Sequence, residues 1–406
     1  MIRNYLFISK NFTGGGLETR IREQIAVFKK HDIRCYLITS KYNHKFDNLF
    51  DGVYLDIDFY LEEKCIKTRL KLMVEKIIQY CKINKIDFID CHPFDSLLPS
   101  VIAANRMGLP ISYTIHGKAS LYYPNNNQEK IKLLNDISIL YGVDLINIVA
   151  ESLNDNLYDY NKINLLENGI IICDKNKYIF PFSRKWALVS RLDKQKAEII
   201  INSLEYLDNE IFDEIEIIGD GEFTEELNEI LSESNYSTKI KVVGWVDDVK
   251  KYLLNNCFDG VIGMGRAVLE AMSLNIPSIM LGYGGIAGLI NKNNYDLFSN
   301  FNFTYYSRIS KRDFIEELNA LYKSPESYEL RKLVKKYNNS LILWEKYLEK
   351  IDTIKPLPKK KIDNMIKVLM SIDSISELEL FNAIFKNDLE ARLKYTSYMN
   401  RRQNNT

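Results

Sequence analysis

The chain of 406 residues has no excess of charge of either sign and no long apolar run. Lys and Arg total 54, and so do Asp and Glu. This balance removes any global electrostatic argument for nucleic-acid binding, so only local patches could attract a polyanion. No window approaches the roughly 18 uninterrupted apolar residues of a spanning helix, and the sequence predicts none.

Cysteine and histidine are also sparse. The six cysteines form no CxxC pair and show no metal-ligand spacing with histidine: Cys35, Cys65, Cys81, Cys91, Cys173 and Cys257. This scatter argues against a disulfide framework and against a zinc site. The first ten residues lead directly into an apolar β-rich segment without a cleavage site, which indicates a first strand rather than a signal peptide. We therefore expect a cytoplasmic protein.

Apolar residues make up 46% of the chain, and they fall into alternating strand and helix patterns. This alternation is typical of parallel sheets covered on both faces. The expected strands are 5–9, 33–39, 52–56, 88–91, 111–115, 145–149, 186–190, 215–218, 240–243, 260–262 and 278–281. The expected helices are 17–30, 68–83, 97–107, 197–207, 224–234, 248–255 and 268–274.

The pattern stops and restarts once, which predicts two doubly wound α/β domains. We expect an N-terminal domain over 1–174 and a C-terminal domain over 175–340, joined at the polar run Cys173–Lys177. Residues 341–354 then form a helix, and a basic linker and helical tail follow over 355–406. Because ligands of parallel sheets bind at the carboxyl ends of strands, two facing sheets would enclose a cleft.

The most informative stretch runs from Gly265 to Gly285. A glycine turn, a short helix with Glu270, an apolar strand and a second glycine turn follow one another in this segment. Glycines let the backbone approach an anion, and a helix start offers unpaired N–H groups. The segment predicts a nucleotide-binding unit, although an ordinary βαβ crossover with a surface Glu remains open.

Other short motifs stand where expected strands end. In order, they are Gly15–Glu18, His116–Gly117, Glu167–Ile170, Ser190–Leu192 with Lys196, Gly219–Glu222 and Gly244–Trp245. Together with the Glu270 segment, these motifs resemble glycosyltransferase family 4 over roughly residues 1–350. The resemblance implies a GT-B fold and a retaining, hexosyltransferase-like enzyme that uses a nucleotide sugar.

The resemblance also implies roles for individual residues. His116 would hydrogen-bond the donor sugar, and Arg191 and Lys196 would grip the donor diphosphate and neutralise the leaving group. The remaining donor-binding candidates are Gly15, Gly16, Gly219, Gly221, Gly244, Trp245, Arg266, Glu270, Gly284 and Gly285. Glu18 and His92 are candidates on the acceptor side. Each of these residues has a structural alternative, namely a tight turn, a solvated cation, a buried histidine or plain packing.

Two positions depart from the family pattern. Glu270 matches the second of two spaced glutamates, the one that binds ribose, but the first would fall at Ile262. Ala197 stands where the family usually has glycine. Arg266 and the backbone around it could compensate for the missing acid at the phosphate.

No metal and no cofactor are expected. Asp56–Asp58 looks like the DxD motif of metal-dependent transferases, but it lies far in sequence from the phosphate segment, so we interpret it as structural. The segment 64–78 reads as a basic amphipathic helix, which is either a solvated flank or a contact with anionic lipid.

The sequence thus predicts a transferase that moves a sugar from a nucleoside diphosphate, with UDP favoured over GDP. The acceptor would be a glycan or lipid-linked glycan of bacterial surface polysaccharide synthesis, with possible peripheral contact at the inner face of the plasma membrane. Two alternatives remain, a GT-B sugar-nucleotide epimerase and an inactive GT-B subunit.

Overall fold

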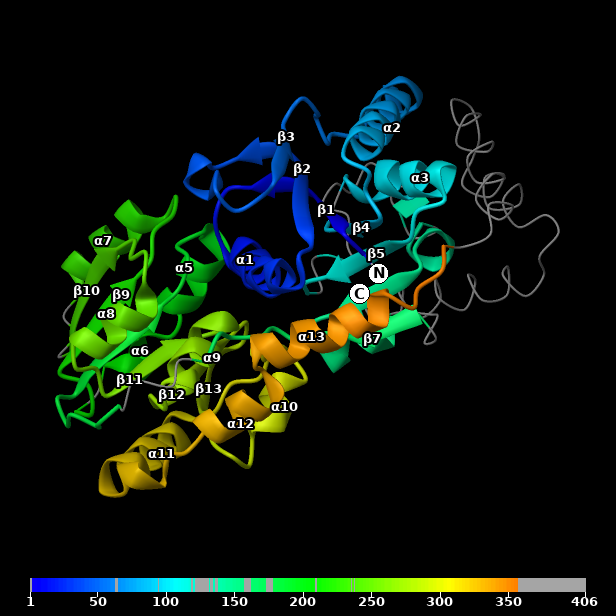
Figure 1. Ribbon diagram of the computed structural model, residues 1–406. Helices are drawn as coiled ribbons and strands as arrows, with labels where there is room; N and C mark the ends of the chain where they lie inside the picture. Colours follow the sequence, from blue (N-terminus) through cyan, green and yellow to red (C-terminus); the bar gives the residue numbers. More distant parts are fainter. Residues whose placement is uncertain are drawn as a thin grey trace. The chain divides into compact units, whose positions relative to one another are not determined.

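The computed structural model describes residues 2–62, 65–93, 95–117, 120, 131, 134–135, 138–156, 162–172, 178–208, 210–234, 236 and 238–356. They divide into unit 1, Met1–Glu167 with Leu341–Thr406, and unit 2, Asn168–Ser340 (Figure 1). The expected join at 173–177 and the helices expected beyond residue 356 lie outside the described residues.

The elements of unit 1 are β1 (Asn4–Phe12), α1 (Gly16–Phe28), η1 (Lys29–His31), β2 (Arg34–Tyr42), η2 (His44–Phe46), β3 (Gly52–Tyr54), α2 (Ile66–Ile83), β4 (Phe88–Cys91), α3 (Leu97–Met107), β5 (Ile111–Ile115), η5 (Ser138–Gly142), β6 (Leu145–Ile148), η6 (Glu151–Asn156), β7 (Ile163–Leu165) and α13 (Ser340–Ile351).

Those of unit 2 are β8 (Lys185–Val189), α5 (Lys194–Ile201), α6 (Leu204–Leu207), β9 (Glu214–Ile218), α7 (Thr224–Glu233), β10 (Lys239–Gly244), α8 (Val249–Asn255), β11 (Gly260–Gly263), α9 (Arg266–Ser273), β12 (Ser278–Gly282), β13 (Gly285–Leu289), α10 (Tyr295–Ser299), α11 (Lys311–Lys323), η8 (Pro325–Ser327) and α12 (Arg331–Tyr337).

The described strands of unit 1 form a parallel sheet in the order β3-β2-β1-β4-β5-β6-β7. Alternate residues of the central β1 face opposite sides, as a pleated strand requires. Leu6 and Ile8 belong to the core beneath α2 and α3, whereas Tyr5 and Phe7 belong to the core beneath α1 and α13. Helices therefore cover both faces of this sheet (Figure 1).

Unit 2 repeats the plan around β8, with the described strands in the order β10-β9-β8-β11-β12-β13. Trp186 and Leu188 of β8 share a core with α5, α6 and α11. Ala187, between them, faces the core that includes α8. Only the β12–β13 pair, among the described strands of this sheet, is antiparallel.

Each sheet has one point where successive connections leave in opposite directions. In unit 1 this switch lies between β1 and β4, and in unit 2 between β8 and β11. The loops at the carboxyl ends of these strand pairs diverge to opposite faces, which leaves a crevice where ligands of such sheets bind. The fold thus directs attention to the turns after β1, β4, β8 and β11.

The expected α/β architecture of two doubly wound sheets is confirmed, with local differences. The helix expected over 197–207 is split into α5 and α6. The amide of Ser203 bonds the carbonyl of Ile200 at 2.9 Å, and its hydroxyl bonds that of Ile199 at 2.8 Å. This tightened turn interrupts the regular ladder. The sequence also gave no expectation of β7 or β13. In the described part of the chain, no helix is both long and apolar enough to cross a bilayer.

Candidate active site

In unit 2, the turns after β8 and β9 pack directly on each other. A Cβ on Gly219 would overlap the carbonyl oxygen of Ser190, and one on Gly221 would meet that of Leu192. The amide of Leu192 bonds the carbonyl of Asp220 at 3.1 Å. Both predicted glycines are therefore needed for the close approach of two backbones, and this contact fixes the course of the turn that carries Arg191.

Two predicted cations follow β8 at the switch point. Asp193 caps α5, since its side chain accepts from the amide of Lys196 at 3.1 Å. The guanidinium of Arg191 lies 3.5 Å from the carboxylate of Asp193 and is largely exposed. The cap thus holds both cations at the start of the same helix, where an anion would meet two positive side chains and the amide end of the helix dipole.

Lys196 spans from β8 towards the next strands of the sheet. Its ammonium contacts the sulfur of Met264, which follows β11, and lies 4.2 Å from the centre of the Tyr283 ring. Burial lowers the pKa of Lys196 to about 8, with Asp193 acting in the opposite direction. Met264 and Tyr283 are neighbours that the sequence did not single out, although Tyr283 stands inside the predicted glycine turn.

Arg266 and Glu270 lie one turn apart on α9 and are paired with each other. Nη2 of Arg266 is 3.5 Å from Oε1 of Glu270, and Nη1 donates to the carbonyl of Gly169 at 2.8 Å. Arg266, which we expected to add a positive charge near the phosphate, thus connects the 167–170 turn to α9. This leaves Glu270 on the helix that begins at the switch point, with an arginine that orients its carboxylate.

Ile262 lies inside β11 and is fully buried between Leu188 and Ile279 of the neighbouring strands. An acid here would be placed in the apolar core, away from the strand end. The predicted position of the missing glutamate is therefore not a part of the site in this chain.

The predicted second glycine turn is the connection of the β12–β13 hairpin. A Cβ on Gly284 would overlap the carbonyl of Tyr306, and one on Gly282 would overlap that of Tyr305. Gly285 begins β13 with a φ of 107°. These glycines let the hairpin pack against the 305–307 backbone and so set the position of Tyr283 beneath Lys196.

Gly244 ends the edge strand β10, and Trp245 follows it. The carbonyl of Gly244 accepts from the amide of Gly219 at 2.8 Å, which ties this turn to the one after β9. Trp245 is 54% exposed, and its Nε1 donates to Asp247 at 2.8 Å. It is not a core residue, which removes plain packing as the reason for an indole at this position.

In unit 1, the glycine turn after β1 is shaped by Glu18. Gly14 and Gly15 have φ values of 131° and 150°, which side chains with a Cβ rarely adopt. Oε1 of the buried Glu18 accepts from the amides of Thr13 and Gly14 at 2.9 and 3.0 Å. The carboxylate predicted to face an acceptor instead holds the turn, and Gly16 opens α1 directly behind it.

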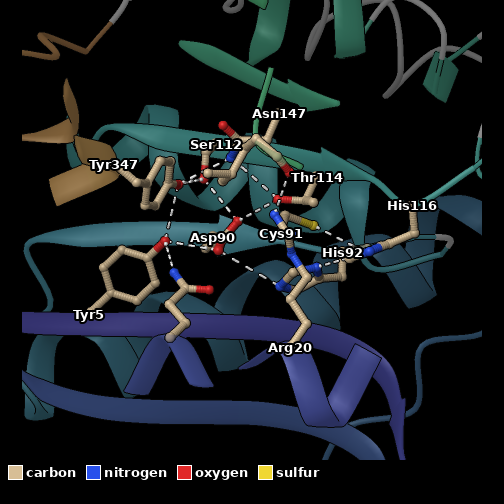
Figure 2. A network of polar contacts seen from close by, with 12 residues as sticks. Tyr5, Arg20, Asp90, Cys91, His92, Ser112, Thr114, His116, Asn147 and Tyr347 are labelled. Atoms are coloured by element: carbon tan, nitrogen blue, oxygen red, sulfur yellow. Dashed lines mark hydrogen bonds and ion pairs between the residues drawn. The ribbon is translucent and has the colours of Figure 1, made fainter. Parts of the chain in front are cut away.

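The two predicted histidines, at the ends of β4 and β5, contact each other. Nδ1 of His92 lies 2.8 Å from Nε2 of His116 (Figure 2). His92 is 1% exposed, so it lies behind His116, which is only half-buried. Burial lowers the pKa of both imidazoles, and for His116 the neighbouring His92 and Arg20 act in the same direction.

A buried polar network that the sequence did not suggest lies beside this pair. Asp90 lies on β4, two residues before His92. Figure 2 shows hydroxyls of neighbouring elements turned towards the carboxylate of Asp90. The sequence signal was present, since a charged residue inside an expected buried strand requires partners.

The acids of Asp56–Asp58 pair with cations of α2. Lys76 lies 2.8 Å from Asp56, and Arg69 lies 3.3 Å from Asp58, which agrees with a structural interpretation of the DxD-like sequence. The apolar stripe of α2 is packed in the core of unit 1 and is not a lipid-facing surface. Among the described residues, no group of three or more Cys, His, Asp or Glu side chains is arranged to hold a metal ion.

Comparison with known proteins agrees with this geometry. Residues 183–321 match the family model "Glycosyl transferases group 1". No curated protein sequence matches the chain. Its fold is similar to that of the lipopolysaccharide outer core galactosyltransferase WaaB, with a TM-score of 0.60 and 16% identity over 86% of this chain and 99% of that one.

Two further solved structures share the fold. Anabaena HepE in complex with UDP and glucose has a TM-score of 0.64 and 14% identity, covering 87% of this chain and 100% of that one. Sucrose-phosphate synthase from Thermosynechococcus elongatus has a TM-score of 0.63 and 13% identity, covering 86% and 98%. At such identities the likeness shows the fold.

The fold is therefore that of the GT-B glycosyltransferases. The family match covers β8 to α11, which includes both cations, α9 and the β12–β13 hairpin. Unit 2 carries a group 1 glycosyltransferase domain, and the domain and the fold together identify the chain as a glycosyltransferase.

Proposed function

We propose that this protein has the activity of glycosyltransferase family 4. It transfers a sugar from a nucleoside-diphosphate sugar to a hydroxyl of a glycan, with retention of the anomeric configuration. The observation that carries the proposal is the pair Arg191 and Lys196 at the switch point of unit 2. Two cations and the start of α5 form a site for a group with two phosphates. UDP is the favoured nucleotide, as in the HepE complexes.

In this proposal, Arg191 and Lys196 bind the diphosphate of the donor, and His116 has the role that the family resemblance implies, a hydrogen bond to the donor sugar. The positive side chains stabilise the charge that develops on the departing diphosphate. A phosphate oxygen of the leaving group then takes the proton of the acceptor hydroxyl, so that the step needs no side-chain base. Glu270, oriented by Arg266, accepts hydrogen bonds from the ribose.

The acceptor side of the proposal is a glycan or lipid-linked glycan of surface polysaccharide synthesis. TarM of S. aureus, a structure with the same fold, was solved with α-GlcNAc-glycerol and UDP. The apolar stripe of α2 belongs to the core. A peripheral contact with anionic lipid would therefore depend on residues of its exposed face, among them Lys71 and the 54% exposed Leu72.

Binding of UDP to the full chain tests the donor site. We expect Lys196→Ala and Arg191→Ala each to weaken binding by about 10- to 100-fold, since a hydrogen bond to a charged group contributes about 1.5–3 kcal/mol. Lys239→Ala is the matched control, because it removes an exposed cation from the opposite end of the same sheet. Equal affinity of all three variants and the native protein would contradict the site.

The reaction is tested by following UDP-sugars with and without glycan acceptors by NMR. A retaining transferase releases UDP and forms a product with the anomeric configuration of the donor. An epimerase would interconvert two nucleotide sugars without releasing UDP, and an inactive subunit would bind UDP and change no sugar. Either result would replace the proposed reaction while leaving the donor site in place.

A further inference from the structure

The two histidines of unit 1 form one end of a chain of polar side chains that starts at Asp90. Nε2 of His92 lies 3.8 Å from Oδ2 of Asp90, and Nδ1 of the same ring lies 2.8 Å from Nε2 of His116. Both Asp90 and His92 are at most 2% exposed. Apart from this carboxylate, Nε2 of His92 has no hydrogen-bond partner among the described residues.

Three hydroxyl groups donate hydrogen bonds to the carboxylate of Asp90. Oδ2 accepts from Tyr5 at 2.8 Å, and Oδ1 accepts from Ser112 at 2.9 Å and from Thr114 at 3.3 Å. Burial and the nearby Asp90 raise the pKa of Tyr5 well above its ordinary value, so its hydroxyl remains a donor. Hydrogen bonds of this kind compensate a buried carboxylate for the water that it loses.

This charge determines which way the hydrogen bond between the two histidines runs. Burial lowers the pKa of both rings below the ordinary value; Arg20 acts in the same direction on both, and Asp90 only partly opposes the shift of His92. The neutral form of each ring therefore predominates at pH 7, and each carries one N–H. If His92 carried its proton on Nδ1, the lone pair of its Nε2 would face the carboxylate. With the proton on Nε2, the N–H dipole points to the negative charge, which is the favourable arrangement in a low-dielectric interior.

The tautomer of His116 follows from that of His92. When Nδ1 of His92 is an acceptor, His116 must donate to it from Nε2, and its own Nδ1 then carries a lone pair. The structure gives this Nδ1 no partner among the described residues, and His116 is the more exposed of the two residues. The network therefore leaves one acceptor atom at the end of β5.

We propose that Asp90 and His92 are positioning residues that fix His116 in the Nε2–H tautomer, so that its Nδ1 accepts a hydrogen bond from a hydroxyl group of the substrate. This inference rests on the proposed function for the identity of that hydroxyl, which belongs to a sugar. The tautomer itself is a property of the free protein. A donor group such as an amide N–H would be recognised as well, whereas a carbonyl oxygen would be rejected.

The first experiment reads the tautomer in the native chain and needs no ligand. The full chain contains four histidines, so 15N-histidine labelling gives a simple spectrum that His116→Gln assigns by removing one residue. We expect the shifts of His116 at pH 7.5 to be those of the Nε2–H tautomer. The Nδ1–H tautomer, or a charged imidazolium, would overturn the proposal, whatever the enzyme transfers.

The second experiment removes the charge at nearly constant shape. In Asp90→Asn, an amide facing Nε2 of His92 can donate to it, so we expect the hydrogen bond to reverse and His116 to move to the Nδ1–H tautomer. Turnover should fall about 10- to 100-fold, as for other groups that orient a reacting side chain. The affinity for UDP, which lacks the sugar, should stay unchanged, because the proposed function assigns the diphosphate to Arg191 and Lys196.

Ser112→Ala is the matched control. It removes one hydrogen bond from the same carboxylate but keeps the charge, so His116 should keep its tautomer and most of its turnover. Loss of turnover in Asp90→Asn with an unchanged tautomer would reduce Asp90 to a structural role and overturn the proposal. If Asp90→Asn does not fold, the spectrum of the native chain still decides the question.

Discussion

At the scale of single residues, Lys196 combines burial with a place at the switch point. Its ammonium lies over the Tyr283 ring and beside Met264, and this surrounding lowers its pKa to about 8. Below that pH the side chain is charged and ready for an anion. Above it, the free protein loses the charge.

This pKa predicts how nucleotide binding depends on pH. A bound diphosphate favours the charged lysine, so the complex takes up a proton above pH 8, and UDP affinity should fall by up to about tenfold per unit between pH 8 and 9.5. Calorimetric titration measures this slope. Lys196→Arg keeps its charge throughout the range and should give a flat profile. A flat profile for the native protein would show that Lys196 does not bind the phosphates.

The place of a site residue in the fold could be predicted from the sequence where neighbouring residues in the chain determine it. Arg191 and Lys196 could be placed because they follow a recognisable strand, and Gly219 because its turn must be tight. The pairing of Arg266 with the carbonyl of Gly169 could not, since it joins residues nearly a hundred positions apart. The hydrogen bonds of Glu18 to the turn amides were not predictable either, because a sequence does not show which way a side chain turns at a helix start.

At the scale of secondary structure, two central strands of unit 1 were predicted to the residue. β4 and β5 were expected over the ranges that the structure shows. β7 was missed because it has only three residues. β13 was missed because it carries Gly285 and Gly288, and glycine is unfavourable in an isolated strand. Pairing with neighbours already in the sheet stabilises them, and that information is not local.

The two histidines at the ends of β4 and β5 predict that the stability of the fold depends on pH. Burial lowers the pKa of His92 and His116, and Asp90 and Glu18 only partly offset this for His92. The unfolded chain then binds more protons than the native state below the ordinary histidine pKa of about 6.5. Stability is full above that pH and decreases as the pH falls below it.

Thermal unfolding between pH 5.5 and 7.5 measures this dependence. We expect the melting temperature to decline below about pH 6.5 and the decline to be smaller in His92→Gln. His44→Gln serves as the control, because this histidine is exposed and its replacement should leave the slope unchanged. An identical slope in all three proteins would mean that the buried pair does not carry the acid response.

At the scale of the whole molecule, the chain leaves unit 1 after Glu167 and returns to it at Leu341. The returning helix α13 places Trp344, Tyr347 and Ile351 in the core beneath α1. The guanidinium of Arg20 lies 4.8 Å from the centre of the Trp344 ring, and Tyr347 shares the network of Asp90 through Ser112 at 3.1 Å. The sheet of unit 1 is therefore completed by a segment made after all of unit 2.

Trp344→Ala tests this dependence, because it removes a side chain that is 2% exposed. Loss of a buried tryptophan should destabilise unit 1 by about 3–5 kcal/mol. In hydrogen exchange followed by mass spectrometry, peptides of β1, β4 and β5 should lose protection, whereas those of β8, β9 and β11 should keep most of theirs. Trp344→Phe retains an aromatic ring over much of the same volume and should lose far less. Equal losses in both sheets of the alanine variant would show that the two units unfold as one, and the returning helix would then stabilise the whole chain rather than the sheet on which it packs.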